Sequence, residues 1–443
     1  MKSIRLFSIL KAVGGICHDF FDCSIEDVTT DTRNIPENSI FIALKGENFD
    51  GNNFVADAFE KGALACIADK KANVTPHKNL ILVEDTGKAL LNLANLYRSI
   101  FSTKIVAITG SVGKTTTKEM VACVLSEQYK TLKTKANLNN LIGLPKTLFG
   151  LEKDTQAAVL EMGMSELGEI SQMSLCALPN VAVITNVGTS HLETLKTREN
   201  ILRAKMEITH GLSAHSPLII NADNDLLKDI KSTAFHVVTY GIYNEKAQVL
   251  AKNITSDGVN TTFDIVTKKE TLTATIPSIG EHNVLNALCA FAVGKAFLMD
   301  NEQIIKGLKN YTPSGMRQKI SEINGIKVVE DCYNASPDSM TAAVKTLASI
   351  KCEGKKIAVL GDMLELGEFS KTAHERIGEL CKQEKIDTVL TFGEMAKFIG
   401  GEHFLSKQEL AKHLKEIAKQ GDTVWFKASR GMKFEEIIEE FSK

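Results

Sequence analysis

The stretch "VAITGSVGKTTTKEM" (106–120) decides how the middle of this chain folds. An apolar run, a glycine turn and a polar segment follow one another, which predicts a strand, a loop and a helix that begins at Lys114. Glycines allow backbone N–H groups to close on phosphate oxygens, and a helix N-terminus adds partial positive charge. Only two residues, Ser111 and Val112, separate Gly110 from Gly113, so the loop is shorter than the common P-loop signature.

This loop has the parts that a nucleotide site needs. Lys114 can reach a terminal phosphate, and Thr115 or Thr116 can place a hydroxyl on Mg²⁺. The alternative is a plain glycine turn with a capping threonine, which the run Gly-Lys-Thr-Thr directly after a strand disfavours. We therefore expect ATP to bind along the loop, at Gly110, Ser111, Val112, Gly113, Lys114, Thr115 and Thr116. The motif indicates nucleotide binding but does not define the reaction.

Length and composition narrow the class of protein. The 443 residues exceed the roughly 250–300 at which a single core stops growing, so two or three domains are expected. A formal charge of −2 gives no reason to expect nucleic acid or an anionic membrane as partner. The nine cysteines are scattered without a Cys-x-x-Cys pair, which argues against a disulfide framework or a zinc site and for a reducing compartment.

The N-terminal stretch "MKSIRLFSILKAVGG" resembles a signal peptide at first sight. Arg5 and Lys11 interrupt its apolar run, so we read it as a helix with one buried face. No apolar run has the length of a membrane span. We expect a soluble cytoplasmic protein that does not insert into membranes, and a monomer.

The pattern along the chain predicts an α/β fold of three domains. Residues 1–82 read as a small mixed α/β domain, 83–311 as a central domain with a mostly parallel sheet, and 312–443 as a C-terminal Rossmann-like domain. "YTPSGMRQK" (311–319) is the predicted linker. Within the central domain, "FHVVTYG" and "TTFDIVT" are expected to form a small antiparallel edge.

The shortened loop resembles the ATP loop of the Mur ligase family, which forms amide bonds in bacterial cell-wall precursors. Further family landmarks follow in order: "NLNNLIGLP" (137–145), "LEMGMSELGEI" (160–170), "ITNVGTSHLETL" (184–195), "ILRAKMEI" (201–208) and "GEHNVLNAL" (280–288). "VVEDCYNASPDSM" (328–340) and "LGDMLELGEFSKTAHERIG" (360–378) resemble the branch that adds D-alanyl-D-alanine to a UDP-muramoyl-tripeptide. The resemblance runs from residue 29 to residue 431 and implies an ATP- and Mg²⁺-dependent ligase that proceeds through an acyl phosphate.

The resemblance also implies roles for residues of the central domain. Thr115 and Glu161 correspond to ligands of one magnesium ion, and His191 to a ligand of a second. Lys205 stands where the family carries a carbamylated lysine, whose inverted charge binds the second metal. From the residues alone, the alternatives are that Glu161 is only a helix cap, that His191 is structural, as a lone histidine usually is, and that Lys205 is an ordinary solvated helix lysine.

The base and substrate sites follow in the same way. His282, Asn283 and Asn286 lie about one helical turn apart and correspond to residues around the adenine, although a polar helix N-terminus is an equal reading. Arg317 and Asp331 match positions that contact phosphate and ribose. The expected contacts of the UDP-tripeptide and the dipeptide are Thr30, Asp31, Arg33, Lys45, Gly46, Asn139, Asn140, Asn334, Ser336, Ser429 and Arg430. For Ser429 and Arg430, a surface salt bridge is the alternative.

Two other functions fit this sequence less well. A folate-type glutamate ligase would lack the Tyr-Asn-Ala segment at 333–335 and the "LGDMLELG" segment. A P-loop switch or regulatory ATPase would carry the longer loop and an aspartate-ended strand, whereas this chain has Glu161 at that place.

Overall fold

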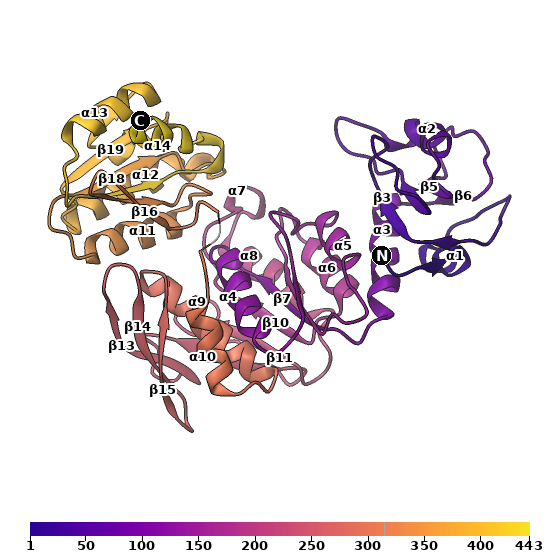
Figure 1. Cartoon of the computed structure of the whole chain (residues 1–443), viewed down its shortest axis with the longest axis horizontal. Coiled ribbons are helices and arrows are strands. Elements are labelled where there is room, and N and C mark those ends of the chain that lie inside the picture. The colour runs from indigo at the N-terminus through magenta and orange to yellow at the C-terminus, as the bar shows by residue number, and fades with distance from the viewer. Residues whose placement is uncertain (314) are drawn as a thin grey trace.

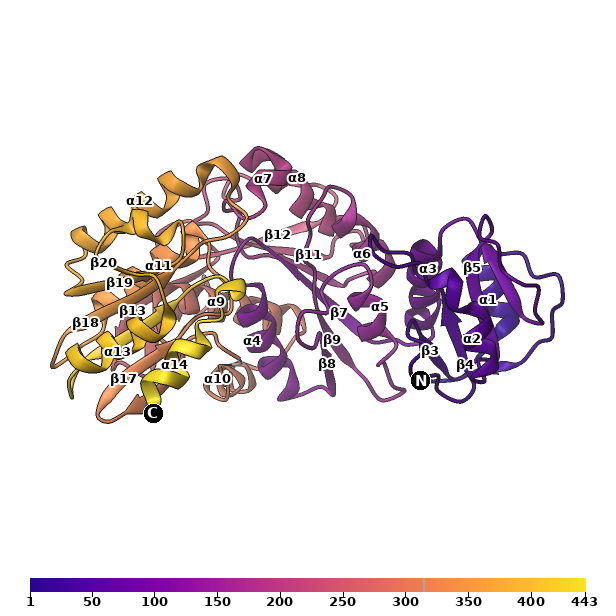
Figure 2. The same ribbon diagram turned by 90° about the horizontal axis from the view of Figure 1, so that it is seen from above.

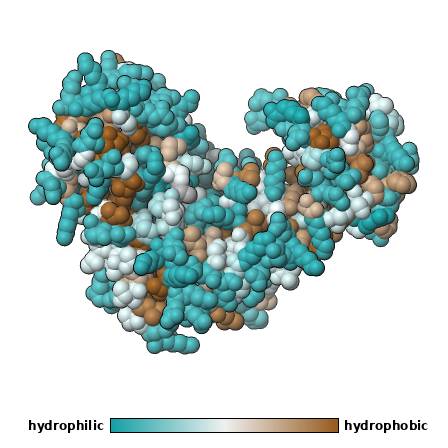
Figure 3. Space-filling model, viewed as in Figure 1, coloured by the Kyte–Doolittle hydropathy of each residue, from teal (hydrophilic) through white to brown (hydrophobic). Residues whose placement is uncertain are grey.

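The computed structural model describes residues 1–313 and 315–443, which form three lobes built around separate sheets (Figure 1). The central lobe lies between the N-terminal and C-terminal lobes, which stand apart from each other (Figure 2). The surface is hollowed between the two outer lobes (Figure 3). Residue 314 of the predicted linker lies outside the described residues.

The N-terminal lobe is a small mixed α/β unit. A four-stranded parallel sheet has the order β3-β4-β5-β6, and β1 pairs with β2 in antiparallel fashion. Its elements are β1 (Ile4–Arg5), α1 (Leu6–Val13), β2 (Ser24–Ile25), β3 (Asp27–Thr29), β4 (Ser39–Ile42), α2 (Val55–Glu60), β5 (Ala65–Asp69) and β6 (Leu80–Val83). The N-terminal stretch is the expected amphipathic helix, because Leu6, Ile9 and Val13 of α1 are buried on one face.

Helix α3 (Thr86–Ser99) joins the first two lobes. Its buried face packs against α1 on one side and against the central helices α5 (Gly143–Leu148) and α6 (Glu169–Ala177) on the other. Tyr97, buried in α3, donates a hydrogen bond to the Leu151 carbonyl at 2.8 Å. The N-terminal and central lobes therefore share one continuous apolar core.

The central lobe contains a nine-stranded sheet of order β15-β14-β13-β12-β11-β10-β7-β9-β8. Its strands are β7 (Lys104–Thr109), β8 (Thr131–Lys133), β9 (Ala157–Glu161), β10 (Val181–Ile184), β11 (Pro217–Asn221), β12 (His236–Gly241), β13 (Val249–Ser256), β14 (Thr261–Val266) and β15 (Thr271–Ile276). Besides α5 and α6, its helices are α4 (Lys114–Ser126), α7 (Leu192–Leu195), α8 (Arg198–Met206), α9 (Glu281–Ala296) and α10 (Asn301–Lys309). Helix α4 packs against α9 and α10, and the strand–loop–helix predicted at 106–120 is confirmed.

The predicted antiparallel edge was wrong in one of its two strands. β12, which contains most of "FHVVTYG", pairs in parallel with β11. The antiparallel edge consists of β13, β14 and β15 instead. The alternating burial of β14 is visible in its sequence, but its partners depend on how the chain returns to the sheet, which periodicity does not encode.

The C-terminal lobe has a six-stranded sheet of order β16-β17-β21-β18-β19-β20, parallel except for β16. Its strands are β16 (Lys319–Ile323), β17 (Ile326–Glu330), β18 (Lys356–Gly361), β19 (Thr388–Phe392), β20 (Glu402–Phe404) and β21 (Thr423–Lys427). Its helices are α11 (Pro337–Ser349), α12 (Ser370–Gln383), α13 (Lys407–Ile417) and α14 (Glu435–Ser442). Apolar clusters lie on both faces of the sheet, as a doubly wound fold requires.

Short 3₁₀ helices complete the fold: η1 (Gly51–Phe54), η2 (Glu207–Thr209), η3 (Gly367–Phe369), η4 (Ala396–Ile399) and η5 (Arg430–Met432). Among the helices in the described part of the chain, none combines the length and apolar character that crossing a bilayer requires.

Candidate active site

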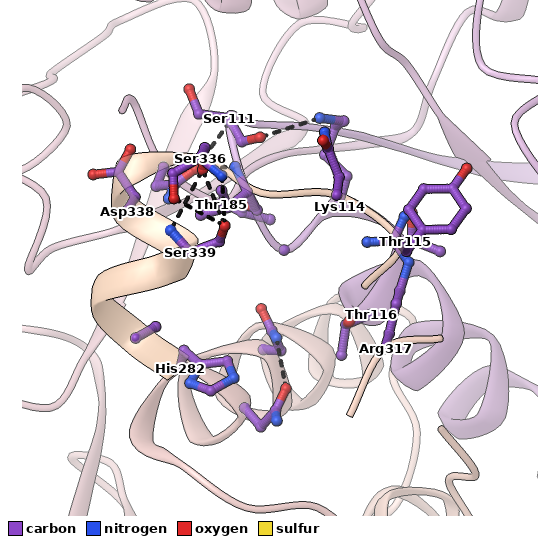
Figure 4. A pocket seen from close by; sticks show the side chains of 18 of the residues that line it. Ser111, Lys114, Thr115, Thr116, Thr185, His282, Arg317, Ser336, Asp338 and Ser339 are labelled. Carbon is purple, nitrogen blue, oxygen red and sulfur yellow. Dashed lines mark hydrogen bonds between the residues drawn. The ribbon is translucent and has the colours of Figure 1, made fainter. Parts of the chain in front are cut away.

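A cavity of about 290 Å³ lies where the central and C-terminal lobes meet. Its central-lobe wall contains the phosphate loop and the start of α9, and its other wall contains the N-terminal part of α11 (Figure 4). The predicted residues that line it are Ser111, Val112, Gly113, Lys114, Thr115, Thr116, Asn139, Glu161, His282, Asn283, Asn286, Arg317, Asp331, Asn334 and Ser336. Segments far apart in the sequence thus converge on one site.

The two glycines of the phosphate loop are required by its geometry. Gly110 has φ 152°, and a Cβ there would lie 1.9 Å from the Thr185 hydroxyl oxygen. Gly113 has φ 84° and precedes the first residue of α4. Both positions therefore exclude an ordinary side chain, in one case by close approach and in the other by backbone conformation.

The segment after β10 supports the loop. Asn186 Oδ1 accepts hydrogen bonds from the backbone N–H groups of Ser111 and Val112, both at 2.9 Å. Thr185 donates its hydroxyl to the Val112 carbonyl at 2.7 Å. The sequence motifs do not reveal a role for Thr185 or Asn186, although polar residues at the carboxyl end of a strand next to β7 are a usable signal.

Lys114 folds back on its own loop. Its Nζ donates to the Gly110 carbonyl at 2.8 Å and to the Ser111 carbonyl at 3.4 Å. Burial lowers the pKa of Lys114, Glu161 opposes that shift, and Arg317 adds to it. The lysine is therefore placed within reach of whatever anion the loop holds.

Glu161 and Thr115 form a pair of oxygen donors beside the loop. Glu161 is 2% exposed, and its Oε2 accepts a hydrogen bond from the Thr115 hydroxyl at 2.9 Å. Its Oε1 accepts from Asn139 Nδ2, also at 2.9 Å, so Asn139 lies at the phosphate end of the cavity. Carboxylate and hydroxyl oxygens are the ligands that Mg²⁺ prefers, so this donor set fits the ion.

His191 and Lys205 lie close enough to Lys114 to interact with it electrostatically. His191 directly precedes α7 in a left-handed conformation, and its pKa is lowered to about 4 by burial and then by Lys114 and Lys205. Lys205, in α8, is 1% exposed, and burial followed by Lys114 holds its pKa well below the usual value. Lys205 is thus not the solvated helix lysine that its sequence context suggests.

Neither residue belongs to a preformed metal cage. In the parts of the chain described, 1–313 and 315–443, no three His, Cys, Asp or Glu side chains gather closely enough to hold an ion by themselves. The predicted ligand set needs the Thr115 hydroxyl and a modified Lys205 in addition to Glu161 and His191.

The far end of the cavity is polar and buried. His282 and Asn283, at the start of α9, meet Gln318 there. Asn286 is nearer the loop, where its Oδ1 accepts from the Thr117 hydroxyl of α4 at 3.0 Å. No role for Gln318 can be predicted from the sequence, because its partners Asn283 and His282 lie 35 and 36 positions away in the chain.

The C-terminal lobe brings further charged residues to the cavity, with Arg317 on the side of the phosphate loop (Figure 4) and Asp331 near His282. The Arg317 guanidinium lies 4.0 Å from the centre of the Tyr333 ring. Asp331 forms an ion pair with Lys427 at 2.7 Å, and Lys427 is buried. Tyr333 and Lys427 are cavity residues that sequence reasoning also missed.

The predicted dipeptide residues divide into two groups. Asn334 and Ser336 line the cavity, where Ser336 caps α11 by accepting from Ser339 N at 3.4 Å. Ser429 and Arg430 do not line it. Ser429 Oγ accepts from Leu364 N at 3.0 Å, and Arg430 forms the alternative surface salt bridge, with Glu435 at 2.7 Å.

The predicted UDP-precursor residues lie in exposed turns of the N-terminal lobe, outside the cavity. Arg33 is 89% exposed and pairs with Asp31 at 2.6 Å, which lowers the pKa of Asp31 to about 2. Lys45 lies 3.8 Å from Asp50, and Gly46 N donates to the Phe49 carbonyl. Thr30 adjoins this turn and is partly buried.

Asn140, the remaining predicted precursor contact, forms hydrogen bonds with the backbone at the start of α5. Its Oδ1 accepts hydrogen bonds from Gly143 N at 2.8 Å and Ile142 N at 3.2 Å. The side-chain oxygen is therefore engaged locally.

Comparisons with known proteins identify the family of the chain. The chain matches the Mur ligase family catalytic domain over residues 24–105, the Mur ligase middle domain over 108–294 and the Mur ligase glutamate ligase domain over 316–430. The chain therefore belongs to the Mur ligase family, and the predicted three-part α/β fold is confirmed.

The relatives include one particular branch of that family. The chain is 42% identical to the UDP-N-acetylmuramoyl-tripeptide–D-alanyl-D-alanine ligase of Bacillus subtilis, over 94% of this chain and 93% of the relative. It resembles a crystal structure of MurF from Acinetobacter baumannii with a TM-score of 0.91 and 31% identity, covering 100% and 99% of the two chains. MurF ligase from Thermotoga maritima in complex with ADP matches with a TM-score of 0.87 and 31% identity, covering 94% and 96%.

Proposed function

We propose that this chain is an ATP-dependent ligase that joins D-alanyl-D-alanine to a UDP-N-acetylmuramoyl-tripeptide. The products are the UDP-linked pentapeptide of peptidoglycan synthesis, ADP and phosphate. One observation carries the proposal: Lys114 of the shortened loop and Glu161 at the end of β9 face C-terminal residues across a single cavity. The relatives that bear this ligase name match nearly the whole chain.

The chemistry follows from the difficulty of condensing a carboxylate with an amine in water. The terminal carboxylate of the tripeptide attacks the γ-phosphorus of ATP, ADP leaves, and an acyl phosphate remains. The dipeptide amine then attacks the acyl carbon, an amide bond forms, and inorganic phosphate departs with one carboxylate oxygen. Bringing two anions together costs energy, so cations must neutralise them.

Lys114 supplies one such cation. In the structure its ammonium group bonds to loop carbonyls, and it would exchange these for phosphate oxygens when ATP binds. Arg317 lines the same cavity and adds a second positive charge. The docked C-terminal lobe encloses the reacting groups and excludes water, which limits hydrolysis of the acyl phosphate.

We place a magnesium ion on Thr115 and Glu161, whose oxygen atoms form the buried pair described above. When bound, Mg²⁺ neutralises and orients the phosphate oxygens. The side-chain amide of Asn139 holds the Glu161 carboxylate in position through a hydrogen bond. A second ion would be held by His191, a neutral imidazole at physiological pH, and by Lys205 as its carbamate.

Burial of Lys205 supports the carbamate. CO₂ reacts with a neutral amine, forming the C–N bond and releasing a proton, and the lowered pKa of Lys205 leaves its amine neutral more often. Lys205→Ala should abolish activity and regain part of it with added short carboxylates. Full activity of this variant, indifferent to carboxylates, excludes the carbamate.

We assign a role to each part of the chain. Residues 1–82 bind the UDP precursor through Arg33 and its neighbours, 83–311 bind ATP, and 312–443 bind the dipeptide and close the site. An exposed guanidinium that a phosphate can engage supports the first assignment. Asn334 and Ser336 are the dipeptide candidates within the cavity. Ser429 and Arg430 are further candidates in the same lobe, and Ser429 donates a hydrogen bond to the carbonyl of the cavity residue Ala335 at 3.4 Å.

The function is tested by product analysis. Purified protein is incubated with ATP, Mg²⁺, UDP-tripeptide and D-alanyl-D-alanine, and the products are weighed by mass spectrometry. With ¹⁸O in the tripeptide carboxylate, one label should appear in inorganic phosphate. ATP hydrolysis that ignores the dipeptide would indicate a switch or regulatory ATPase and overturn the proposal.

We further propose that the enzyme acts as a cytoplasmic monomer. All nine cysteines are free thiols in the described residues, which suits a reducing compartment. Light scattering of the purified protein at increasing concentration measures the mass, and a stable dimer would refute the monomer.

A further inference from the structure

A chain of side-chain amides connects the linker to helix α9 at the far end of the cavity. Asn283 Nδ2 lies 2.9 Å from the Ile279 carbonyl, 2.7 Å from Ser278 Oγ and 2.6 Å from Gln318 Oε1. A backbone carbonyl can only accept a hydrogen bond, so Asn283 must present its NH₂ group to this side. The amide oxygen of Asn283 agrees with this orientation, because Oδ1 accepts a hydrogen bond from Asn286 Nδ2 at 3.2 Å.

The orientation of Gln318 follows from that of Asn283. Since Asn283 donates, Gln318 must offer its oxygen, and its NH₂ group is directed at His282. Gln318 Nε2 lies 2.8 Å from His282 Nε2. An amide NH₂ has no acceptor capacity, so His282 Nε2 must accept and carry no proton. A neutral His282 ring then has its proton on Nδ1.

The surroundings of His282 agree with a neutral ring. Burial lowers the pKa of His282 to about 4, with Asp331 opposing the shift and Lys427 adding to it. Asp331 and Lys427 face the ring from the C-terminal lobe and pair with each other. From α11, Thr346 approaches the same corner, near Gly280. Among the described residues, the hydrogen bond to the His282 ring comes from Gln318, so Gln318 determines which of the two ring nitrogens carries the proton.

The contact between Gln318 and His282 crosses from one lobe to another. His282 and Asn283 belong to α9 of the central lobe, whereas Gln318 directly precedes β16 of the C-terminal lobe. Gln318 is buried and has a φ of 54°. Figure 4 shows His282 on the opposite side of the cavity from Lys114. If the loop holds the phosphates, His282 lies where the nucleoside must go.

We propose that Gln318 is a positioning residue that fixes His282 in its Nδ1-protonated tautomer, so that docking of the C-terminal lobe sets the hydrogen-bonding pattern of the nucleoside pocket. The nucleotide part of this inference rests on the proposed ligase function. The tautomer itself is a property of the protein without substrates.

Two substitutions separate this role from simple packing. Gln318→Glu keeps an acceptor for Asn283 but presents a second acceptor to His282, which must then carry a proton on Nε2. Gln318→Met retains the approximate volume and removes both hydrogen bonds. Gln383→Glu, at the exposed end of α12, introduces the same charge away from the site and is the matched control.

The first measurement is the ¹⁵N spectrum of histidine-labelled protein without substrates, with His282 assigned by its disappearance in His282→Gln. The wild type and Gln383→Glu should show a protonated Nδ1 and a bare Nε2. Gln318→Glu should show a protonated Nε2, and its imidazole should titrate at higher pH than in the wild type. A wild-type ring protonated on Nε2, or an unchanged spectrum in Gln318→Glu, overturns the inference without bearing on ligase activity.

The second measurement is steady-state kinetics. In Gln318→Glu the buried hydrogen bond to His282 Nε2 reverses its donor and acceptor. This change should raise the KM for ATP about tenfold, with less than about a twofold change in kcat. The increase should vary with pH as the imidazole titrates, whereas in Gln318→Met it should be flat. Equal, pH-independent effects in both variants would show a packing role and overturn the proposal. Absence of ligation by the wild type would overturn the proposed function and leave the spectroscopic result intact.

Discussion

The phosphate loop and the Thr30–Arg33 turn of the N-terminal lobe are both expected to bind a phosphate-bearing substrate, ATP in one case and the UDP-tripeptide in the other, yet they are built differently. The loop is enclosed, and Asn186, Thr185 and Glu161 support it from neighbouring strands. Arg33 is exposed, and its recorded ion pair is with Asp31, two residues away. One site is assembled by the tertiary structure, whereas the other presents a side chain to solvent.

This difference indicates where the binding energy is used. A buried, supported loop can hold charges in the arrangement that the transition state needs, which raises kcat. An exposed arginine in high dielectric contributes mainly to ground-state binding. Variants should therefore affect catalysis strongly at the loop and substrate affinity weakly at the turn.

The strongest test of this contrast is Lys114→Ala. Without its ammonium group, the γ-phosphate and the attacking carboxylate repel each other, and kcat should fall by about 10³-fold or more. Lys153→Ala, at an exposed turn, serves as the control and should retain wild-type activity. A fall of less than tenfold in Lys114→Ala would place the essential cation elsewhere.

Glu161→Gln should have the next largest effect. The substitution retains the shape but removes the charge that binds Mg²⁺, so kcat should fall by about 10²–10³-fold and the Mg²⁺ requirement should rise. Activity is measured over a Mg²⁺ titration, with Glu152→Gln as an exposed control. An unchanged Mg²⁺ dependence would contradict the role of Glu161 as a ligand.

Gly110→Ala tests how closely the loop is packed. The added Cβ would meet Thr185 Oγ1, so the free energy of unfolding should fall by about 1–3 kcal/mol, and ATP affinity should weaken. Gly62→Ala also has positive φ, at +100°, but meets nothing within 4 Å, so it isolates the backbone cost. Thermal denaturation measures both. If Gly110→Ala costs no more than Gly62→Ala, the close approach is unimportant.

Asp338→Ala tests the contact between α11 and the segment after β10. Asp338 Oδ2 accepts a hydrogen bond from Thr189 N at 3.2 Å, two residues before His191. Loss of this bond should reduce kcat by about three- to tenfold, since one hydrogen bond between lobes is lost. Asp338→Asn, which keeps an acceptor oxygen, should retain more activity. Equal losses in both variants would point to the charge rather than the hydrogen bond.

The smallest effect is expected at the exposed turn. Arg33→Ala should raise the KM for the UDP-tripeptide by about five- to tenfold, with kcat and the KM for ATP nearly unchanged. Steady-state kinetics with each substrate varied in turn measures this. A large fall in kcat would remove the contrast between the two regions.

The sequence by itself determined the strand, glycine turn and helix at 106–120, the α/β class and the family. These depend on local backbone preferences and on motifs whose residues are neighbours in the chain, so short stretches are sufficient. The position of Lys114 at the start of α4 was predictable for the same reason.

Only the tertiary structure decided which side chains meet. It brought Asn186 under the loop, Asn139 onto Glu161, and Gln318 between Asn283 and His282, and it paired Arg430 with Glu435. It also made β12 parallel rather than part of the antiparallel edge. Such contacts depend on the order in which distant strands join a sheet and on how two lobes dock. The spacing of nearby residues in the sequence determines neither of these.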